Sequence, residues 1–312
     1  MRDKIAPAGN AAKCDSAASR SQYIPTMVHA LVSTDWLAAR LGQSNLRIVD
    51  ASWYLPSSGR DAHAEFIAGH LPGAVFLDLD AVSDQNTSLP HMLPAAPEFA
   101  RYMESLGIGD DTMVVVYDGS GVNLSAPRVW WMLRVFGHSE VAVLDGGLGK
   151  WQREGRLLET GERAVPPATT RFTARLDHRA VRDLAAMTAN LRSGAEQVLD
   201  ARAAGRFTGS EPEPRPGMRG GHIPGSRNLP FTDLVDAADG TLLSPERLRS
   251  LFAAAGIDLS RPVVTSCGSG VTACALALGL EVAGHPVAGV YDGSWSEWGG
   301  RNDTPVETGP AS

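Results

Sequence analysis

Short apolar runs alternate along the chain with segments in which apolar residues recur every three or four positions. In the first half, the apolar runs are 46-LRIVDAS-52, 113-MVVVYD-118 and 141-VAVLD-145. The segments with helical spacing are 35-DWLAARLG-42, which Thr34 or Asp35 would cap, 97-PEFARYMESLG-107 and 127-PRVWWMLRVFG-137. Short, largely apolar strands that alternate with helices predict a parallel sheet covered by helices on both faces.

The second half of the chain has the same alternation. Predicted strands cover 197–202, 262–266 and 287–292, and predicted helices cover 180–194, 244–256 and 271–284. Ser244 and Pro245 form a cap and a first turn for the middle one of these helices. Gly107, Gly137 and Gly256 stand where a left-handed residue ends a helix.

Three segments of the first half recur in the second half. The segment 69-GHLPGA-74 recurs as 221-GHIPGS-226, and 141-VAVLDGG-147 recurs as 287-VAGVYDGS-294. Between these landmarks, 113-MVVVYDGSG-121 corresponds to 262-PVVTSCGSG-270, so Asp118 stands where Cys267 stands. Three landmarks in one order and at nearly one spacing indicate two homologous domains.

These patterns predict the domain organisation. We predict an α/β protein with two tandem domains, residues 27–154 and 178–302, and a tail at 303–312. The linker between the domains, 155–177, lacks periodicity and contains Pro166 and Pro167. Residues 1–26 are polar, are rich in Ala and Ser and lack the apolar core of a secretory signal. We predict that they form a disordered extension, with a transit peptide as the alternative.

The composition of the chain mainly excludes certain classes of protein. Hydrophobic residues make up 43% of the 312 residues and charged residues 20%, which predicts a globular protein. The net charge of −7 gives no sign of nucleic-acid binding, and no apolar stretch is long enough to cross a membrane. Three irregularly spaced cysteines do not make a disulfide framework or a metal site, which favours a reducing, cytoplasmic location.

One cysteine stands at a position that favours chemistry. Cys267 ends a predicted central strand, and Gly268, Ser269 and Gly270 lead from it into a helix. Ligands bind at the carboxyl ends of strands in open α/β sheets. Backbone N–H groups of a glycine-rich loop at a helix start form a nest for an anion, and such a setting can lower the pKa of a thiol from about 8.5 to about 3.5–7.5. We therefore interpret Cys267 as a nucleophile; the alternative is a buried structural cysteine.

Other chemistries of glycine-rich loops do not fit this sequence. A cysteine phosphatase needs an arginine six residues after its cysteine, where this chain has Ala273. No Gly-Lys-Ser/Thr follows the loop, as a P-loop requires, and the chain has no Cys-x-x-Cys motif. Cys274 falls on the following helix among Ala and Leu, which is typical of a core residue; a resolving thiol is the alternative.

The loop 267-CGSGVTA-273 resembles the active-site loop of rhodanese-type sulfurtransferases, and it is similar to the 3-mercaptopyruvate type within that family. The segments 206-RFTGSEPEPR-215, 75-VFLDLD-80, 91-HMLP-94 and 291-YDGSWSEWG-299 agree, and the resemblance covers about residues 28–302. Thiosulfate-type relatives carry basic residues in the loop, where this chain has Gly268 and Ser269. The resemblance also implies a silent first domain, because the aspartate at 118 cannot carry a sulfane sulfur.

The resemblance implies a double displacement that needs no metal and no organic cofactor. Cys267 takes the sulfur of 3-mercaptopyruvate, pyruvate leaves, and a thiol, a reduced thioredoxin or cyanide accepts the sulfur from the Cys267 persulfide. No nucleic acid and no membrane takes part. By their match to the family, the implied site residues are Cys267, Ser269, His91 and Asp80 as catalytic groups, Arg206 and Arg215 with the loop residues Gly268, Gly270, Val271 and Thr272 as substrate-binding groups, and Asp200 in support.

Alternatives to these roles stay open at the level of sequence. His91 could be a structural histidine packed beside Met92 and Pro94, Asp200 could be a plain strand-end cap, and the two arginines could be solvated surface residues. Packing is the expected role of the tryptophans Trp130, Trp131, Trp295 and Trp298. For the whole protein, the alternatives are a thiosulfate sulfurtransferase and a non-catalytic sulfur-relay or binding module on the same fold.

Overall fold

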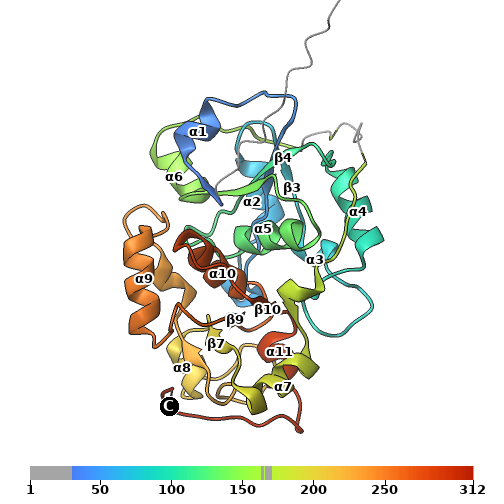
Figure 1. Cartoon of the computed structure of the whole chain (residues 1–312). Coiled ribbons are helices and arrows are strands. Elements are labelled where there is room, and N and C mark those ends of the chain that lie inside the picture. Colours follow the sequence, from blue (N-terminus) through green and yellow to red (C-terminus); the bar gives the residue numbers. More distant parts are fainter. Residues whose placement is uncertain (1–29, 163–164, 166–170, 312) are drawn as a thin grey trace, which may run out of the picture.

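Each half of the chain forms one β-sheet with its own helices (Figure 1). The structure, a computed structural model, describes residues 30–162, 165 and 171–311. The first half contains β1 (Leu31–Val32), α1 (Thr34–Ala38), β2 (Leu46–Asp50), α2 (Ala62–Ala68), β3 (Ala74–Phe76), α3 (Leu79–Val82), α4 (Ala96–Ser105), β4 (Met113–Tyr117), α5 (Ala126–Val135), β5 (Val141–Leu144) and α6 (Gly147–Arg153). The second half contains β6 (Val181–Arg182), α7 (Leu184–Ser193), β7 (Gln197–Asp200), α8 (Ala204–Thr208), β8 (Arg227–Asn228), α9 (Pro245–Ala254), β9 (Val263–Ser266), α10 (Ala273–Val282), β10 (Gly289–Tyr291) and α11 (Ser294–Trp298).

The two sheets have one topology. Their strand orders are β1-β5-β4-β2-β3 and β6-β10-β9-β7-β8, and every pairing is parallel. The orders become identical when the strands are counted within each half. The repeat seen in the sequence is therefore a repeat of the fold, and β9, which leads to Cys267, is the central strand of its sheet.

Helices cover both faces of each sheet, as the apolar strands predict. Consecutive residues of β4 belong to different cores, because side chains alternate across a strand. Val114 and Val116 join the core that includes α4 and α5, and Val115 and Tyr117 join the core that includes α1, α2 and α6. In the second sheet, Val263 joins the core with α9 and α10, and Val264 joins the core with α7 and α11.

The helices α5 and α10 pack against each other where the two domains meet, in the middle of the molecule (Figure 1). One apolar core runs through this contact and includes strands of both sheets. Trp130 and Trp131 are buried in it, and Trp295 and Trp298 are buried in the second domain. Packing is thus the observed role of all four tryptophans.

Most predicted central elements are present, with shifts of a few residues at their ends. Ser244 caps α9 as predicted, and Gly107, Gly137 and Gly256 have the predicted left-handed backbone. Two predictions were wrong. The helix expected from residue 180 begins at Leu184, because Asp183 caps it and Val181 pairs with Val290 in the sheet. The first helix is capped by Ser33, whose hydroxyl accepts the N–H of Trp36 at 3.1 Å.

Two other predictions concern parts of the chain that the structure does not cover. Residues 1–26, for which the sequence predicts a disordered extension, lie outside the described residues, and so do Pro166 and Pro167 of the linker. The described part of the segment 155–177 contains no helix or strand.

The repeated Gly-His-x-Pro-Gly motif has a structural role in both domains. The ring nitrogen Nδ1 of His70 lies 2.8 Å from the carbonyl oxygen of Phe66, and Nδ1 of His222 lies 2.9 Å from that of Phe207. Each imidazole also stacks on the ring of that phenylalanine. The motif therefore fixes equivalent turns in the two domains and does not belong to the site around Cys267.

Candidate active site

Cys267 follows β9 directly, and its side chain is buried at the start of a loop of free backbone donors. The carbonyl groups of Cys267 and Gly268 accept hydrogen bonds from Trp295 at 2.9 Å and from Ser296 at 2.8 Å, so α11 holds the first part of the loop. Within the described part of the chain, no backbone N–H of residues 268–272 donates a hydrogen bond. These donors precede α10, whose helix dipole adds partial positive charge.

The first domain shows how such a loop binds an anion. The carboxylate of Asp118, at the position equivalent to Cys267, accepts the N–H of Ser120, of Ser125 and of Ala126, each at 2.9 Å. The last two donors stand at the start of α5. The loop between strand and helix is therefore an anion nest, filled in the first domain by a fixed carboxylate.

Three side chains predicted to form a relay do lie together. His91 Nδ1 is 2.9 Å from the hydroxyl oxygen of Ser269, and His91 Nε2 is 3.0 Å from the carboxylate of Asp80. His91 and Asp80 belong to the first domain and Ser269 to the second, so the group spans the domain boundary. A carboxylate only accepts hydrogen bonds, so Nε2 of His91 carries the proton and Nδ1 accepts from the hydroxyl.

The protonation of this group follows from its surroundings. Burial lowers the pKa of His91 below 6.5, although Asp80 partly offsets this effect. The hydrogen bond from His91 lowers the pKa of Asp80. At neutral pH, the resting state is therefore a neutral imidazole beside a charged carboxylate.

The two predicted arginines both reach the loop but differ in their partners. Nη2 of Arg206 is so close to Gly268 that a β-carbon there would lie 3.0 Å from it, and Arg206 also pairs with Glu213 at 2.5 Å. Arg215 makes no hydrogen bond and no ion pair within the described residues. Burial lowers the pKa of Arg215, and the nearby Cys267 opposes this effect. Arg215 is thus the guanidinium with donors to spare.

Asp200 lies beside the loop but does not contact it with its carboxylate. Its backbone pairs with Ser266, the residue before Cys267. Its side chain binds the buried Arg202 at 2.7 Å, and Arg202 binds Glu213 at 2.7 Å. Asp200 therefore begins a chain of charges, through Arg202 and Glu213, that ends at Arg206.

A hollow of about 550 Å³ opens beside Arg215. The segment 87–90 of the first domain borders it on one side, and residues of 296–301 in the second domain border it on the other. Ser296, which binds the carbonyl group of Gly268, also lines the hollow. The hollow is thus shared by both domains and lies next to residues that contact the loop.

Three charged residues at the site were not predicted from the sequence, namely Arg128, Glu213 and Asp292. The Arg128 side chain of α5 is fully buried and pairs with Asp292 of the second domain at 2.8 Å. It also bonds to the carbonyl group of His91 at 2.5 Å. The sequence held a partial signal for Arg128, because it is one of only two charged residues, with Arg134, on a predicted helix that is apolar elsewhere.

Cys274 is a core residue. Its side chain is fully buried in α10, and its sulfur lies 3.3 Å from the carbonyl oxygen of Gly270. Burial raises the pKa of Cys274 to about 12, so its thiol stays protonated. These properties do not suit the alternative role of a resolving thiol. Cys14 lies outside the described residues.

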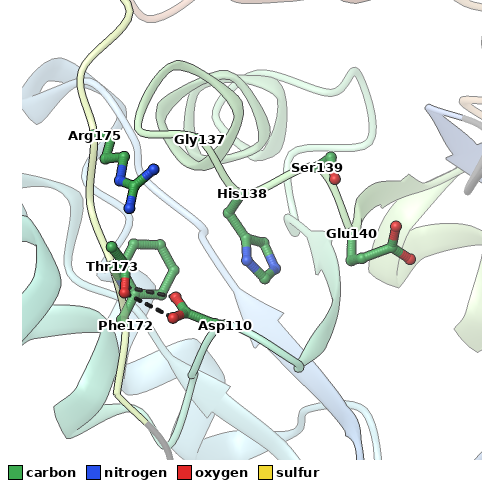
Figure 2. Close-up of a pocket in the computed structure, with 8 residues that line it drawn as sticks. All are labelled: Asp110, Gly137, His138, Ser139, Glu140, Phe172, Thr173 and Arg175. Carbon is green, nitrogen blue, oxygen red and sulfur yellow. Dashed lines mark hydrogen bonds between the residues drawn. The ribbon is translucent and has the colours of Figure 1, made fainter. Parts of the chain in front are cut away.

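A second hollow, of about 320 Å³, lies in the first domain and contains no residue of the cysteine loop (Figure 2). Asp110 there binds the backbone and the hydroxyl of Thr173, at 2.6 and 2.7 Å, as Figure 2 shows. These bonds tie the last part of the linker back to the first domain. We assign this hollow a structural role, since its polar contacts hold the chain segments around it together.

Among the residues that the structure describes, no three His, Cys, Asp or Glu side chains are placed to share a metal ion. In the same part of the chain, no helix has both the length and the apolar character that a membrane span requires.

Two tandem domains, each with a strand–loop–helix nest at the same point and one of them with a cysteine in it, define the class of this protein. The chain belongs to the rhodanese family, with Rhodanese-like domains at residues 33–154 and 183–301. It is 50% identical over 280 residues to the 3-mercaptopyruvate sulfurtransferase of Homo sapiens, covering 88% of this chain and 93% of that protein. It is 45% identical over 293 residues to the thiosulfate sulfurtransferase of Cricetulus griseus, covering 90% and 97%.

The fold is also similar to solved structures. The crystal structure of SseA from Escherichia coli, described as one of the 3-mercaptopyruvate sulfotransferases, matches with a TM-score of 0.77 and 39% identity. The match covers 86% of this chain and 99% of that one.

Proposed function

We propose that this protein is a 3-mercaptopyruvate sulfurtransferase, with Cys267 as the residue that carries sulfur. The observation that carries the proposal is the placement of Cys267 in a nest of free backbone N–H groups, with Ser269, His91 and Asp80 in hydrogen-bond contact beside it. The nest stabilises a thiolate and then the persulfide anion, because backbone donors and the dipole of α10 favour negative charge. The 50% identical human relative bears the name of this activity.

In the first half-reaction, the Cys267 thiolate attacks the sulfur of 3-mercaptopyruvate. A sulfur–sulfur bond forms, the carbon–sulfur bond breaks, and its electron pair stays on carbon as the enolate of pyruvate. Arg215 and Arg206 bind the carboxylate of the donor, since a guanidinium matches a carboxylate with two parallel donors. Gly268 keeps the loop open to the arginines, because a β-carbon there would crowd Arg206.

The proton of the donor thiol has to reach the enolate carbon. Neutral His91 takes it through the hydroxyl of Ser269, and the charged Asp80 stabilises the imidazolium that forms. The same path returns the proton to the enolate, so pyruvate leaves as a neutral ketone with its carboxylate. His91 starts in the correct state for this task because its lowered pKa keeps it neutral at pH 7.

In the second half-reaction, an acceptor removes the outer sulfur of the persulfide. A small thiol or the thiolate of a reduced thioredoxin attacks that sulfur, and the electron pair of the sulfur–sulfur bond returns to Cys267. The hollow beside Arg215 is the route for the acceptor, since it is lined by Arg215 and by Ser296, which binds the carbonyl group of Gly268 in the loop. A cytoplasmic location, with its reduced thiols, fits this proposal.

The proposed domains are residues 27–154 and 178–302, with 155–177 as linker and 303–312 as tail. The first domain is silent in this scheme, because the carboxylate of Asp118 already fills its nest. Its contribution is His91, Asp80 and Arg128.

Thiosulfate is the second candidate donor, because a thiosulfate sulfurtransferase is 45% identical to this chain. The loop itself argues against thiosulfate as the main donor. Residues 267–272 carry no cationic side chain, whereas thiosulfate is a dianion at its point of attack. Proton transfer through Ser269 and His91 is also not needed with thiosulfate, because sulfite leaves without taking up a proton.

The test compares pyruvate release from 3-mercaptopyruvate with sulfur transfer from thiosulfate to cyanide, in wild type and in Cys267→Ser. We expect turnover mainly with 3-mercaptopyruvate, and at least about 1,000-fold less in the variant. A preference for thiosulfate would contradict the assignment of the donor. Activity with neither donor would favour a non-catalytic sulfur-relay or binding module.

A further inference from the structure

We propose that Arg128, a first-domain residue, is a positioning residue that sets the contact between Ser269 and His91 across the domain boundary. This inference rests on the proposed function for its kinetic consequence. Its structural part, the control of one hydrogen bond by one guanidinium, stands on the geometry alone.

The guanidinium of Arg128 binds the backbone on both sides of the relay. Nη2 donates to the carbonyl oxygen of His91 at 2.5 Å, and Nη1 donates to that of Gly270 at 3.4 Å. Gly270 is the residue next to Ser269. One rigid, planar group thus holds both partners of the Ser269–His91 hydrogen bond by their main chains.

Both of these main-chain positions have an unusual backbone conformation. His91 has φ +61° and Gly270 has φ +77°, both in the left-handed region. For histidine, this conformation costs free energy, so the surrounding structure has to enforce it. The hydrogen bond from Arg128 to the His91 carbonyl group is such a constraint, and it directs the imidazole toward the second domain.

The charge of Arg128 is balanced from the second domain. Asp292 pairs with it at 2.8 Å through one carboxylate oxygen, and the other oxygen accepts the N–H of Leu93 at 2.8 Å. Leu93 lies two residues after His91. Asp292 therefore provides a second contact to the segment that contains His91. The Arg128–Asp292 pair thus links this segment of the first domain to the loop that contains Gly270 in the second domain.

The internal repeat shows that this arginine serves only one of the two nests. Gly137 and Gly284 end the equivalent helices α5 and α10, and the residue nine positions before each is Arg128 and Ala275, respectively. The helix that faces the nest of Cys267 carries a buried cation, and the helix that faces the nest of Asp118 carries a methyl group. A buried charge costs several kcal/mol unless it is paired, so fold stability alone gives no reason for this asymmetry.

The experiment uses the full-length protein and replaces Arg128 by Met and by Lys. Arg134→Met is the matched control, because Arg134 lies on the same helix and pairs across the domain boundary with Glu281, at 3.3 Å, away from the loop. Displacement of the relay should lower kcat for 3-mercaptopyruvate about 100-fold in Arg128→Met, with KM changed less than about threefold. Lys should not restore kcat, since an ammonium group cannot bind two carbonyl groups and a carboxylate in the same geometry.

Two further readouts separate positioning from general damage. The rate at which iodoacetamide alkylates Cys267 should stay within about threefold of wild type, since the nest itself is intact. The double variant Arg128→Met/Asp292→Asn removes both buried charges and should recover thermal stability without recovering kcat. Recovery of both would overturn the proposal, because Arg128 would then act only as the partner of Asp292.

A measurement without substrate keeps this test independent of the proposed function. In ¹⁵N NMR spectra, His91 of the wild type should show a single tautomer, with Nδ1 as acceptor, and Arg128→Met should show a tautomer mixture. Unchanged His91 signals in the variant would overturn the inference. Absence of pyruvate release in the wild type would count against the proposed function alone.

Discussion

At the scale of single residues, the site is defined by which hydrogen-bond donors already have an acceptor within the protein. In the first domain, the carboxylate of Asp118 occupies its nest, while the equivalent amides beside Cys267 have no partner in the described chain. Arg206 pairs with Glu213, whereas Arg215 has no hydrogen-bond or ion-pair partner among the residues that the structure describes. Donors that already have an acceptor stabilise the fold, and donors without one are the candidates for binding a ligand.

Replacement of Arg215 should weaken donor binding most. We expect Arg215→Met to raise KM for 3-mercaptopyruvate about 10- to 100-fold, because a charged hydrogen bond to the carboxylate contributes about 1.5–3 kcal/mol. Arg301→Met is the control, since Arg301 lines the same hollow but pairs with Asp303 at 2.6 Å. Steady-state kinetics measure both effects. Equal KM values in the two variants would contradict the assigned role.

The relay predicts a specific pH profile. The pKa of His91 is lowered by burial, so the imidazole stays neutral as the pH falls to 6.5 and is protonated only below it. We expect kcat for 3-mercaptopyruvate to show a loss with its midpoint below pH 6.5, and His91→Gln to lack this step. His178→Gln, at an exposed histidine, should keep it. A step at or above pH 6.5 would contradict the assignment.

The same lowered pKa affects stability. The unfolded chain binds this proton at about 6.5 and the folded chain binds it at lower pH, so protonation favours unfolding as the pH falls below about 6.5. Above that pH, the term vanishes. Urea denaturation at pH 7.5 and at pH 5.5 should therefore show a smaller loss of stability in His91→Gln than in wild type.

At the scale of elements, the loop between β9 and α10 depends on one left-handed glycine. A β-carbon at Gly270 would lie 2.8 Å from the carbonyl oxygen of Asp292 and 3.1 Å from Nη1 of Arg128. The loop therefore cannot carry a side chain at this point without moving Asp292 or Arg128.

Gly270→Ala should thus destabilise the protein by about 2 kcal/mol or more. Gly284→Ala is the matched control, because Gly284 has φ +82° but open space around it, and its cost should be about 1 kcal/mol. Urea denaturation midpoints give both values. Similar midpoints for the two variants would show that the loop adapts to the added methyl group.

The elements that the sequence predicted are those with a strong local pattern. β4, β9, α5 and α9 have long apolar runs or clear caps, and the structure contains them. The edge strands β6 and β8 are two residues long, and no periodicity can reveal a strand of that length. Their pairing comes from the sheet beside them and not from their own residues.

At the scale of the whole molecule, the domain boundary has an approximate two-fold symmetry. Asp292 accepts the N–H of Leu93 from the other domain, and Asp145 accepts the N–H of Leu242 in the same way, both at 2.8 Å. Two residues before each leucine stand His91 and Gly240, both with a positive φ. The boundary with Asp145 thus repeats the scaffold of the boundary with Asp292, without an imidazole at the position of His91 and without a guanidinium at the position of Arg128.

This symmetry predicts that a substitution at the boundary with Asp145 lowers stability and leaves activity nearly unchanged. Asp145→Ala should lower the free energy of unfolding by about 1–2 kcal/mol, since it leaves the Leu242 donor without its acceptor. The kcat of this variant should stay within about twofold of wild type, because Asp145 lies at the domain boundary away from Cys267. Denaturation and pyruvate release, measured on one preparation, test both parts. A large loss of kcat would show that the two boundaries are not independent.

The loop 267–272 and the two arginines Arg206 and Arg215 could be singled out from the sequence because they lie in contiguous motifs, and the structure places them side by side. Arg128 was not, because its partners His91, Gly270 and Asp292 are brought together only by the packing of α5 on α10. A charged residue in a largely apolar helix can be noticed in the sequence. The backbone carbonyl groups that it binds cannot, because every residue has one.

The core shared by α5 and α10, with Arg128 and Asp292 sealed inside it, has a consequence for movement. No hinge can open at this boundary without exposing two charges and a continuous apolar surface. We therefore expect the two domains to keep their relative placement during turnover. In the proposed reaction, an acceptor then has to reach a stationary loop through the hollow beside residues 87–90. We expect this geometry to favour small thiols, and proteins whose thiol lies on a narrow protrusion.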